Sequence, residues 1–156
     1  MLLTGSCHCQ SVRFEVESPH PYPFNCCYCS ICRKTAGGGG FAINLSAEYD
    51  SLKIAGKQNI SVYFAIIDGQ KSQAERIFCK QCGSALWVYD SRWPKLVHPF
   101  ASAIDTDLPK PPERTHLMLD SKAGWVDVDA KEHDQCFAEY PDESIAQWHN
   151  RLNLSE

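Results

Sequence analysis

The sequence predicts a mostly β protein made of two small antiparallel sheets, with one short helix near the C-terminus. Three observations support this fold class. Apolar and polar residues alternate over short runs, turn-forming residues separate these runs, and helical spacing occurs only in the tail. Parallel βαβ units would need amphipathic helices between the strands. We therefore expect a single domain over residues 1–156, large enough to bury a core without disulfides.

The first predicted strand shows the alternation most clearly. Val12, Phe14 and Val16 alternate with charged residues, which is typical of a half-buried antiparallel strand. Gly, Asp, Asn or Ser residues separate most of the later β-rich runs. In chain order, these predicted strands are 41–45, 51–54, 60–66, 74–78, 86–89, 97–101, 116–119 and 125–128.

The predicted helix spans residues 143–152. Asp142 can cap its first turn, and Ile145, Trp148 and Leu152 follow at helical spacing. These three apolar residues would share one face, so we expect the helix to lie on the surface of a sheet.

Composition and charge exclude several classes of protein. The formal net charge is -4, and no basic stripe is present to neutralise phosphates, so we expect no nucleic-acid partner. No apolar run is long enough to span a bilayer, and we expect no membrane partner. The nine cysteines follow no secretory signal and are odd in number, which favours metal binding in a reducing, cytoplasmic setting over disulfides. Cys136 stands apart and is expected to be a buried free thiol.

Two cysteine pairs far apart in the sequence have the spacing of a zinc site. Cys7 and Cys9 flank His8, and alternation in an extended segment turns both sulfurs to one side. Cys79 and Cys82 form a Cys-x-x-Cys turn, in which two thiolates can converge on one ion. We predict that the four thiolates form a closed, structural zinc site that joins the start of the chain to its middle.

A denser cluster lies between these two pairs. Cys27, Cys29 and Cys32 can hold one ion and leave a fourth position for water or a substrate thiol. A zinc-bound thiol is deprotonated near neutral pH, although its free pKa is about 8.5. Reaction at sulfur is therefore the predicted chemistry. Cys26 is either a bystander or a fourth ligand, and in the second case the site would be closed and structural.

The residues that follow this cluster are candidates for substrate binding. Arg33 and Lys34 could pair with a substrate carboxylate or be solvated charges. The run Gly37 to Gly40 is either a turn into the next strand or a loop that lets a substrate backbone approach the thiolates. Among these residues, Arg33, Gly38 and Gly39 are the predicted substrate contacts.

At these cysteines the chain resembles the glutathione-dependent formaldehyde-activating family, whose members share a β-tent zinc fold with centromere protein V. The matching blocks are Gly5-Ser6-Cys7-His8-Cys9, Cys27-Tyr28-Cys29-Ser30-Ile31-Cys32-Arg33-Lys34 and Phe78-Cys79-Lys80-Gln81-Cys82-Gly83-Ser84. The resemblance implies a structural zinc on Cys7, Cys9, Cys79 and Cys82, and a catalytic zinc on Cys27, Cys29 and Cys32. The chain departs from the family in two places: members commonly have a histidine where Tyr28 stands, and they lack a cysteine at position 26.

The sequence is compatible with two functions. The first is a zinc-dependent carbon–sulfur lyase that acts on a thiol adduct, as in the formation of S-hydroxymethylglutathione from glutathione and formaldehyde. The catalytic zinc of such an enzyme can be labile. The second is a non-catalytic zinc module that binds a protein partner.

Overall fold

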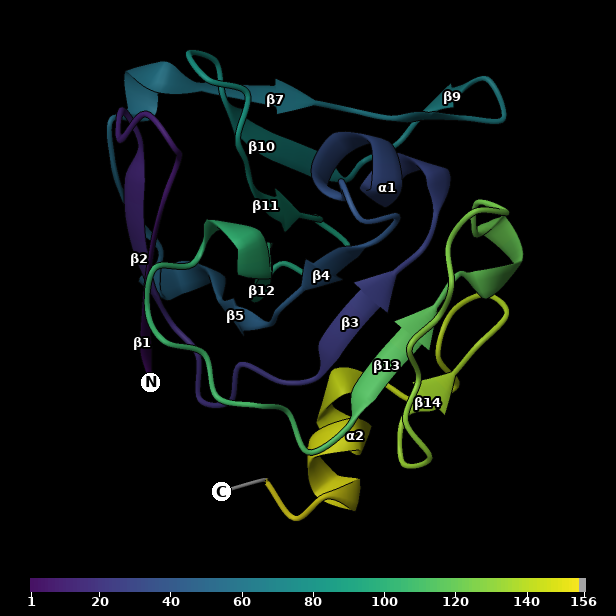
Figure 1. The fold of residues 1–156 in the computed structure, drawn as a ribbon. Coiled ribbons are helices and arrows are strands. Elements are labelled where there is room, and N and C mark those ends of the chain that lie inside the picture. The colour runs from purple at the N-terminus through teal and green to yellow at the C-terminus, as the bar shows by residue number, and fades with distance from the viewer. Residues whose placement is uncertain (155–156) are drawn as a thin grey trace.

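A computed structural model describes residues 1–154 of the chain (Figure 1), and most of its regular elements are strands. The strands are β1 (Leu2–Ser6), β2 (Arg13–Glu17), β3 (Phe24–Cys27), β4 (Ala42–Asn44), β5 (Ala47–Glu48), β6 (Lys53–Ala55), β7 (Ile60–Tyr63), β8 (Ile66–Ile67), β9 (Gln70–Lys71), β10 (Glu75–Cys79), β11 (Ala85–Tyr89), β12 (Leu96–Pro99), β13 (Arg114–Leu117) and β14 (Gln135–Cys136). The helices are α1 (Ser30–Ala36), α2 (Ile145–Arg151) and four short 3-10 turns at Tyr49–Ser51, Lys57–Asn59, Ala101–Ala103 and Leu119–Ser121.

The strands form three small sheets and one two-stranded ribbon. The N-terminal sheet has the order β1-β2-β6, the central sheet β5-β12-β11-β10-β7 and the third sheet β14-β13-β3-β4, while β8 and β9 form the ribbon. The predicted mostly β fold with a short C-terminal helix is confirmed. The sheets are more numerous than predicted, and β13 pairs in parallel with both β3 and β14. A long connection makes this possible, because the whole central sheet lies between β3 and β13 in the sequence.

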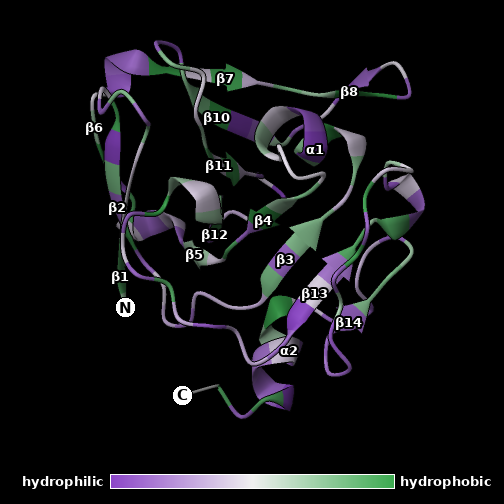
Figure 2. Ribbon diagram, viewed as in Figure 1, coloured by the Kyte–Doolittle hydropathy of each residue, from purple (hydrophilic) through white to green (hydrophobic). Residues whose placement is uncertain are grey.

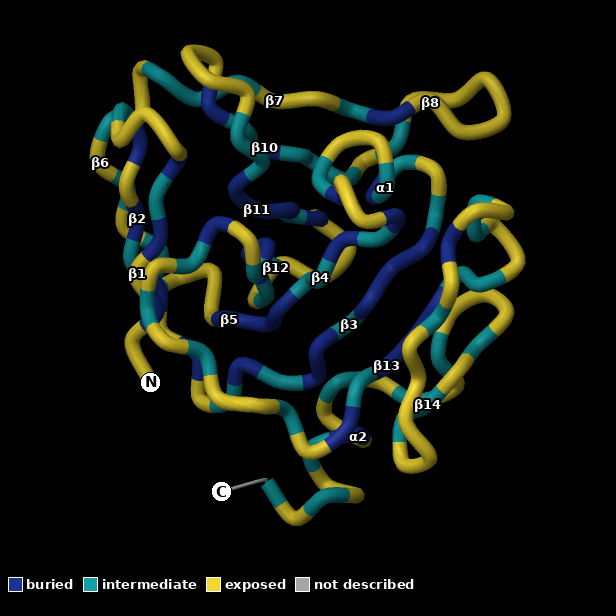
Figure 3. The backbone as a smooth tube through the Cα atoms, viewed as in Figure 1, coloured by how far each residue is buried: buried dark blue, intermediate teal, exposed yellow. Residues whose placement is uncertain are grey.

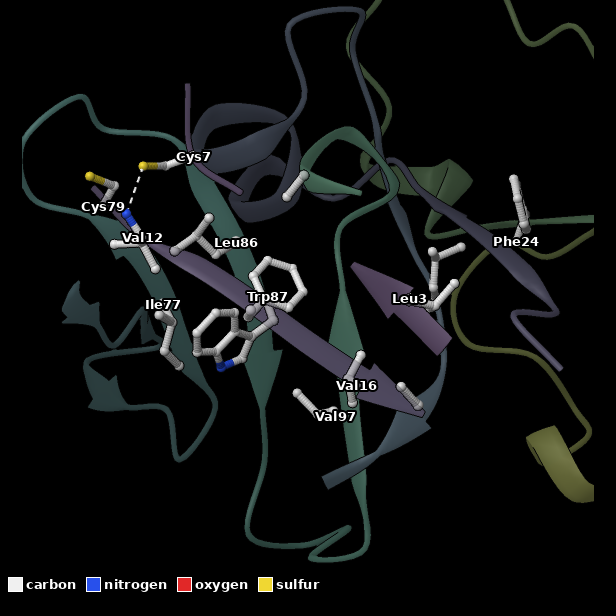
Figure 4. Packing of buried hydrophobic residues seen from close by; sticks show 14 residues of the cluster. Leu3, Cys7, Val12, Val16, Phe24, Ile77, Cys79, Leu86, Trp87 and Val97 are labelled. Atoms are coloured by element: carbon white, nitrogen blue, oxygen red, sulfur yellow. Dashed lines mark hydrogen bonds between the residues drawn. The ribbon is translucent and has the colours of Figure 1, made fainter. Parts of the chain in front are cut away.

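The main core lies between the N-terminal and central sheets. Hydrophilic and hydrophobic residues alternate along β2 (Figure 2), and this alternation directs Phe14 and Val16 inward, where they are almost fully buried. The Phe14 ring meets Trp87 edge-on at a centroid distance of 5.0 Å. Cys7 and Cys79 lie beside Val12 and Leu86 in this core (Figure 4). Cys7 and Cys79 therefore anchor the first cysteine group in this core.

The third sheet carries the middle cysteine cluster. Strand β3 is largely buried, whereas much of the chain beyond β13 is exposed (Figure 3). The predicted strand at 125–128 is wrong, because this segment forms turns and irregular structure that cover the sheet. Helix α1 was not predicted, since its seven residues are too few to show apolar periodicity. The N-cap of α1 is Cys29, whose sulfur accepts a hydrogen bond from the Cys32 N–H at 3.3 Å.

Helix α2 begins later than predicted. Ser144, not Asp142, is its N-cap, and Ser144 and Gln147 exchange hydrogen bonds in a capping box. Trp148 is buried, as the helical spacing predicted. Among residues 1–154, no helix has the length and apolar character needed to cross a bilayer.

Candidate metal centres

The four cysteines of the first group converge as predicted. Cys7 and Cys9 follow β1, while Cys79 ends β10 and Cys82 lies in the turn after it. All four sulfurs lie within 4.8 Å of one another, and we call this group the first centre. Cys7 and Cys79 are buried, whereas Cys9 and Cys82 are exposed. The centre therefore lies at the edge of the core, where it joins the N-terminal and central sheets.

The sulfur spacing of the first centre fits a tetrahedral zinc ion. The Cys9 sulfur lies 3.6 Å from that of Cys7 and 3.8 Å from that of Cys79. A zinc–sulfur bond of about 2.3 Å gives a tetrahedral edge of about 3.8 Å between sulfurs, whereas a disulfide would bring them to about 2.05 Å. The donor set thus matches zinc and not a pair of disulfides.

Backbone and side-chain groups around the first centre suit thiolates. The Val12 N–H donates to the Cys7 sulfur at 3.3 Å, and the Gln81 N–H lies 3.4 Å from the Cys79 sulfur. A hydrogen bond with Ser84 lowers the pKa of Cys82 to about 5, while burial raises the pKa of Cys7 to about 11. In the metal-free chain the exposed thiol therefore ionises first, and the buried one is the harder of the two to deprotonate.

The second centre consists of Cys27, Cys29 and Cys32. Cys27 ends β3, Cys29 caps α1 and Cys32 lies in the first turn of that helix. Their sulfurs lie within 4.8 Å of one another, and among residues 1–154 no further His, Cys, Asp or Glu side chain joins this group. Hydrogen bonding with Cys27 and Cys32 lowers the pKa of Cys29, and the contact with Cys29 raises the pKa of Cys27. Three thiolates at this spacing can hold a zinc ion and leave one position for another ligand.

Cys26 is not part of the second centre. Its side chain is fully buried in a different cluster, with Tyr28 and Val126. Burial raises its pKa to about 11, so the thiol stays protonated at neutral pH. The structure therefore favours the open arrangement over the closed, four-cysteine alternative. Cys136 is exposed, and the prediction of a buried thiol there is wrong, because β14 lies at the edge of its sheet.

Arg76 contacts the second centre and was missed in the sequence. Both of its terminal nitrogens lie close to the Cys32 sulfur, at 3.7 and 3.8 Å. Strand β10 thus carries a ligand of the first centre, Cys79, and a cation beside the second. Three thiolates and one divalent ion sum to a charge of -1, which Arg76 would offset. Because the contact is long-range, the residues around Arg76 carry no local signal of it.

Tyr140 also lies near the second centre. Burial, together with the nearby Cys27 and Cys29, raises the pKa of Tyr140. Its side chain as a whole is 73% exposed, so the ring forms part of the outer surface. No local pattern singles out this tyrosine, which comes from the tail of the chain.

The predicted substrate contacts lie in α1 and in the glycine run that follows it. Arg33 is in α1, and its buried Nε has no hydrogen-bond partner among the described residues. In the glycine run, a Cβ on Gly40 would clash with the Val126 side chain, and the φ of Gly40 is +100°. Gly38 and Gly39 are exposed and would tolerate a Cβ without contact. The run is therefore a tight turn that leaves an accessible tip, and its role in substrate binding stays a prediction.

The fold and the two centres together define a class of protein: a small β domain with one four-cysteine and one three-cysteine site, both suited to zinc. Comparison with known proteins identifies the family. Residues 2–120 match the profile of the "Glutathione-dependent formaldehyde-activating enzyme" family, and the chain belongs to this family.

Individual relatives agree with this assignment. A Halomonas elongata protein, provisionally named a glutathione-dependent formaldehyde-activating enzyme, is 67% identical over 156 residues, which are 100% of this chain and 99% of that protein. An uncharacterized lyase of Schizosaccharomyces pombe is 28% identical over 83 residues, or 53% of this chain and 54% of the lyase. The crystal structure of a Rhodobacter sphaeroides protein superposes with a TM-score of 0.55 at 26% identity, covering 68% of this chain and 91% of that one.

Proposed function

We propose that the protein is a zinc-dependent carbon–sulfur lyase that interconverts glutathione, formaldehyde and S-hydroxymethylglutathione. The observation that carries the proposal is the second centre, where three cysteine sulfurs converge without a fourth protein ligand among residues 1–154. Cys27, Cys29 and Cys32 would hold the ion. When bound, zinc supplies the positive charge that keeps a nearby substrate thiol deprotonated at neutral pH.

The chemistry balances without an oxidant or reductant. In the synthetic direction the glutathione sulfur, as thiolate, attacks the carbonyl carbon of formaldehyde. A carbon–sulfur bond forms, the carbon–oxygen π electrons move to oxygen, and this oxygen takes up the proton that the thiol lost. The lyase direction reverses each step. Formaldehyde is small and needs little recognition, so the binding energy would come from the peptide part of glutathione.

Residues around the second centre would bind and orient this substrate. Arg76 stands beside Cys32 and would lower the electrostatic cost of bringing another anionic sulfur to three thiolates. Arg33 can offer its guanidinium to a glutathione carboxylate. The exposed tip at Gly38 and Gly39 would let the peptide backbone come close. Behind the sulfurs, Phe100 and Leu117 form an apolar wall.

A direct test is the rate at which zinc-loaded protein exchanges ¹³C-labelled formaldehyde with its glutathione adduct, measured by exchange NMR. We expect acceleration above the uncatalysed rate, and a loss of at least about 100-fold in Cys32→Ser, since a metal ligand matters at least as much as the groups that support it. Cys136→Ser is the matched control, because Cys136 is exposed and outside both centres. Wild-type rates in Cys32→Ser would refute the assigned site, and no acceleration by zinc-loaded protein would refute the activity.

A further inference from the structure

Tyr28 stands between two ligands of the second centre but faces away from them. Cys27 and Cys29 turn toward the metal cluster, whereas the Tyr28 side chain, only 1% exposed, packs with Cys26 and Val126 in a separate buried cluster. Its ring lies 4.9 Å from that of Phe41. A side chain at this place in the sequence can fix the ligand segment from behind.

The Tyr28 hydroxyl begins a buried chain of hydrogen bonds. It lies 2.9 Å from Nδ1 of His116, and Nε2 of His116 lies 3.4 Å from Oδ2 of Asp134. The side chains of His116 and Asp134 are each 2% exposed. Both contacts are satisfied when Nδ1 of His116 accepts from the tyrosine hydroxyl and the Nε2–H donates to the carboxylate. We call these three residues the relay.

Asp134 is itself held by the backbone. Its Oδ1 accepts the Arg114 N–H at 2.8 Å, and its Oδ2 accepts the Lys131 N–H at 2.9 Å. At the other end of the relay, the Tyr28 N–H donates to the Leu117 carbonyl at 3.1 Å. The relay therefore connects the ligand segment, strand β13 and the tail of the chain through groups that water does not reach.

Because the relay is buried, its three side chains hold one another in place. Leaving a buried polar group without its partner costs more free energy than the hydrogen bond itself contributes. Each of the three side chains therefore holds the next one in place. Tyr28 is the residue between Cys27 and Cys29 in the sequence. Holding its hydroxyl in place therefore also holds the backbone that carries these two cysteines, and limits how far their sulfurs can move. Second-layer contacts of this kind usually act on ring or carboxylate ligands, and here the contact acts through the backbone.

We propose that Tyr28, His116 and Asp134 are positioning residues that hold Cys27 and Cys29 in place for metal binding. This inference rests on the second centre holding a metal, as the proposed function requires. It also gives a role to the tail of the chain, because Asp134 lies outside residues 2–120, the segment that matches the family profile.

The test is a competition titration of Co²⁺ and Zn²⁺ against a chromophoric chelator, applied to the full chain. Tyr28→Phe keeps the ring and removes only the hydroxyl. We expect the metal affinity of the second centre to fall by about tenfold, with unchanged affinity at the first centre. Asp134→Asn should weaken the second centre as well, and the double variant should lose less than the product of the two single effects, because both changes break the same relay.

Two controls separate positioning from general destabilisation. Tyr49→Phe removes the hydroxyl of a ring that stacks on Tyr89 and belongs to neither centre, and its affinities should equal those of wild type. In a Cys32→Ser background only the first centre remains, and adding Tyr28→Phe there should leave its affinity unchanged. The apo-protein melting temperature of each variant is recorded in parallel.

Three outcomes would overturn the relay. Unchanged affinity of the second centre in Tyr28→Phe would remove its positioning role, and equal weakening of both centres would show a general loss of stability. Both outcomes leave the proposed function intact. A wild-type protein that binds one metal ion only, at the first centre, would overturn the relay and the proposed function together.

Discussion

The two centres differ in how far apart along the chain their ligands lie. In the first centre, Cys9 and Cys79 are separated by 70 positions; Cys9 lies in the turn between β1 and β2, and Cys79 ends β10 of the central sheet. In the second centre, Cys27, Cys29 and Cys32 lie within six consecutive residues, from the end of β3 to the first turn of α1. Closing a long loop is costly in chain entropy, so a metal that closes it contributes to folding. A metal held by one short loop contributes little to folding, and its ligands can instead be arranged for chemistry.

Removing a cysteine of the first centre is expected to have the largest effect on stability. We expect Cys79→Ser to lower the free energy of unfolding by more than about 4 kcal/mol, because a buried ligand and the metal that joins two sheets are lost together. Thermal unfolding with zinc present checks this, and Cys32→Ser is the paired variant, expected to unfold close to wild type. Similar losses in both variants would show that the second centre is structural too.

A glycine change tests the loop of the second centre without touching a ligand. Gly40→Ala should destabilise the protein by about 2 kcal/mol, because the residue has a positive φ and a Cβ there meets Val126. Gly39→Ala is the matched control, since a Cβ at Gly39 meets nothing within 4 Å. Chemical denaturation of both variants measures the difference. Equal stability would contradict the tight-turn interpretation of the glycine run.

Arg76→Gln tests whether the positive charge beside the second centre supports substrate binding. The variant removes the cation beside Cys32 and should lower kcat/KM for the glutathione adduct by about tenfold, an electrostatic effect that weakens with added salt. Arg13→Gln controls for a general change of charge, because Arg13 is exposed on the N-terminal sheet. An Arg76→Gln enzyme with wild-type kinetics would exclude a role for this cation in substrate binding.

The smallest expected effect is on the pH dependence of stability, and it comes from His98, which belongs to neither centre. Burial lowers the pKa of His98, whose Nδ1 donates to the Leu45 carbonyl at 2.9 Å. Above its ordinary pKa of about 6.5 the ring is neutral in both states; as the pH falls below this value, the unfolded chain gains a proton that the folded protein resists, and stability is lost. Wild type should therefore lose more thermal stability than His98→Asn between about pH 7 and pH 5. Parallel pH profiles of the two proteins would contradict this.

The two cysteine clusters could be predicted from the sequence because most of their spacing is local. Cys7 and Cys9, like Cys79 and Cys82, form half-sites within a few residues of each other, and only the joining of the halves depends on the fold. The predicted extended conformation of Cys7 and Cys9 is wrong, because the Gln10 N–H donates to the Cys7 carbonyl at 3.0 Å and closes a turn there. The family resemblance supplied the same division. Most strands were predicted for the same reason, since alternation is a local pattern.

Contacts between distant segments were not predictable in this way. Arg76 contacts Cys32, and Tyr28 contacts His116, only because the chain folds back on itself. The residues next to them in the sequence show no pattern that predicts these contacts. The parallel pairing of β13 with β3 depends on a connection through the whole central sheet. Helix α1 was missed because a seven-residue helix capped by a cysteine shows neither periodicity nor a usual cap.

The central claim is that one centre is saturated by protein and the other accepts an outside thiol. The most direct measurement is the absorption spectrum of the cobalt-substituted protein, loaded with two equivalents and titrated with glutathione. We predict that glutathione changes the bands of wild type and leaves those of Cys32→Ser, which retains the first centre only, unchanged. Two centres that are both insensitive to glutathione would contradict this account.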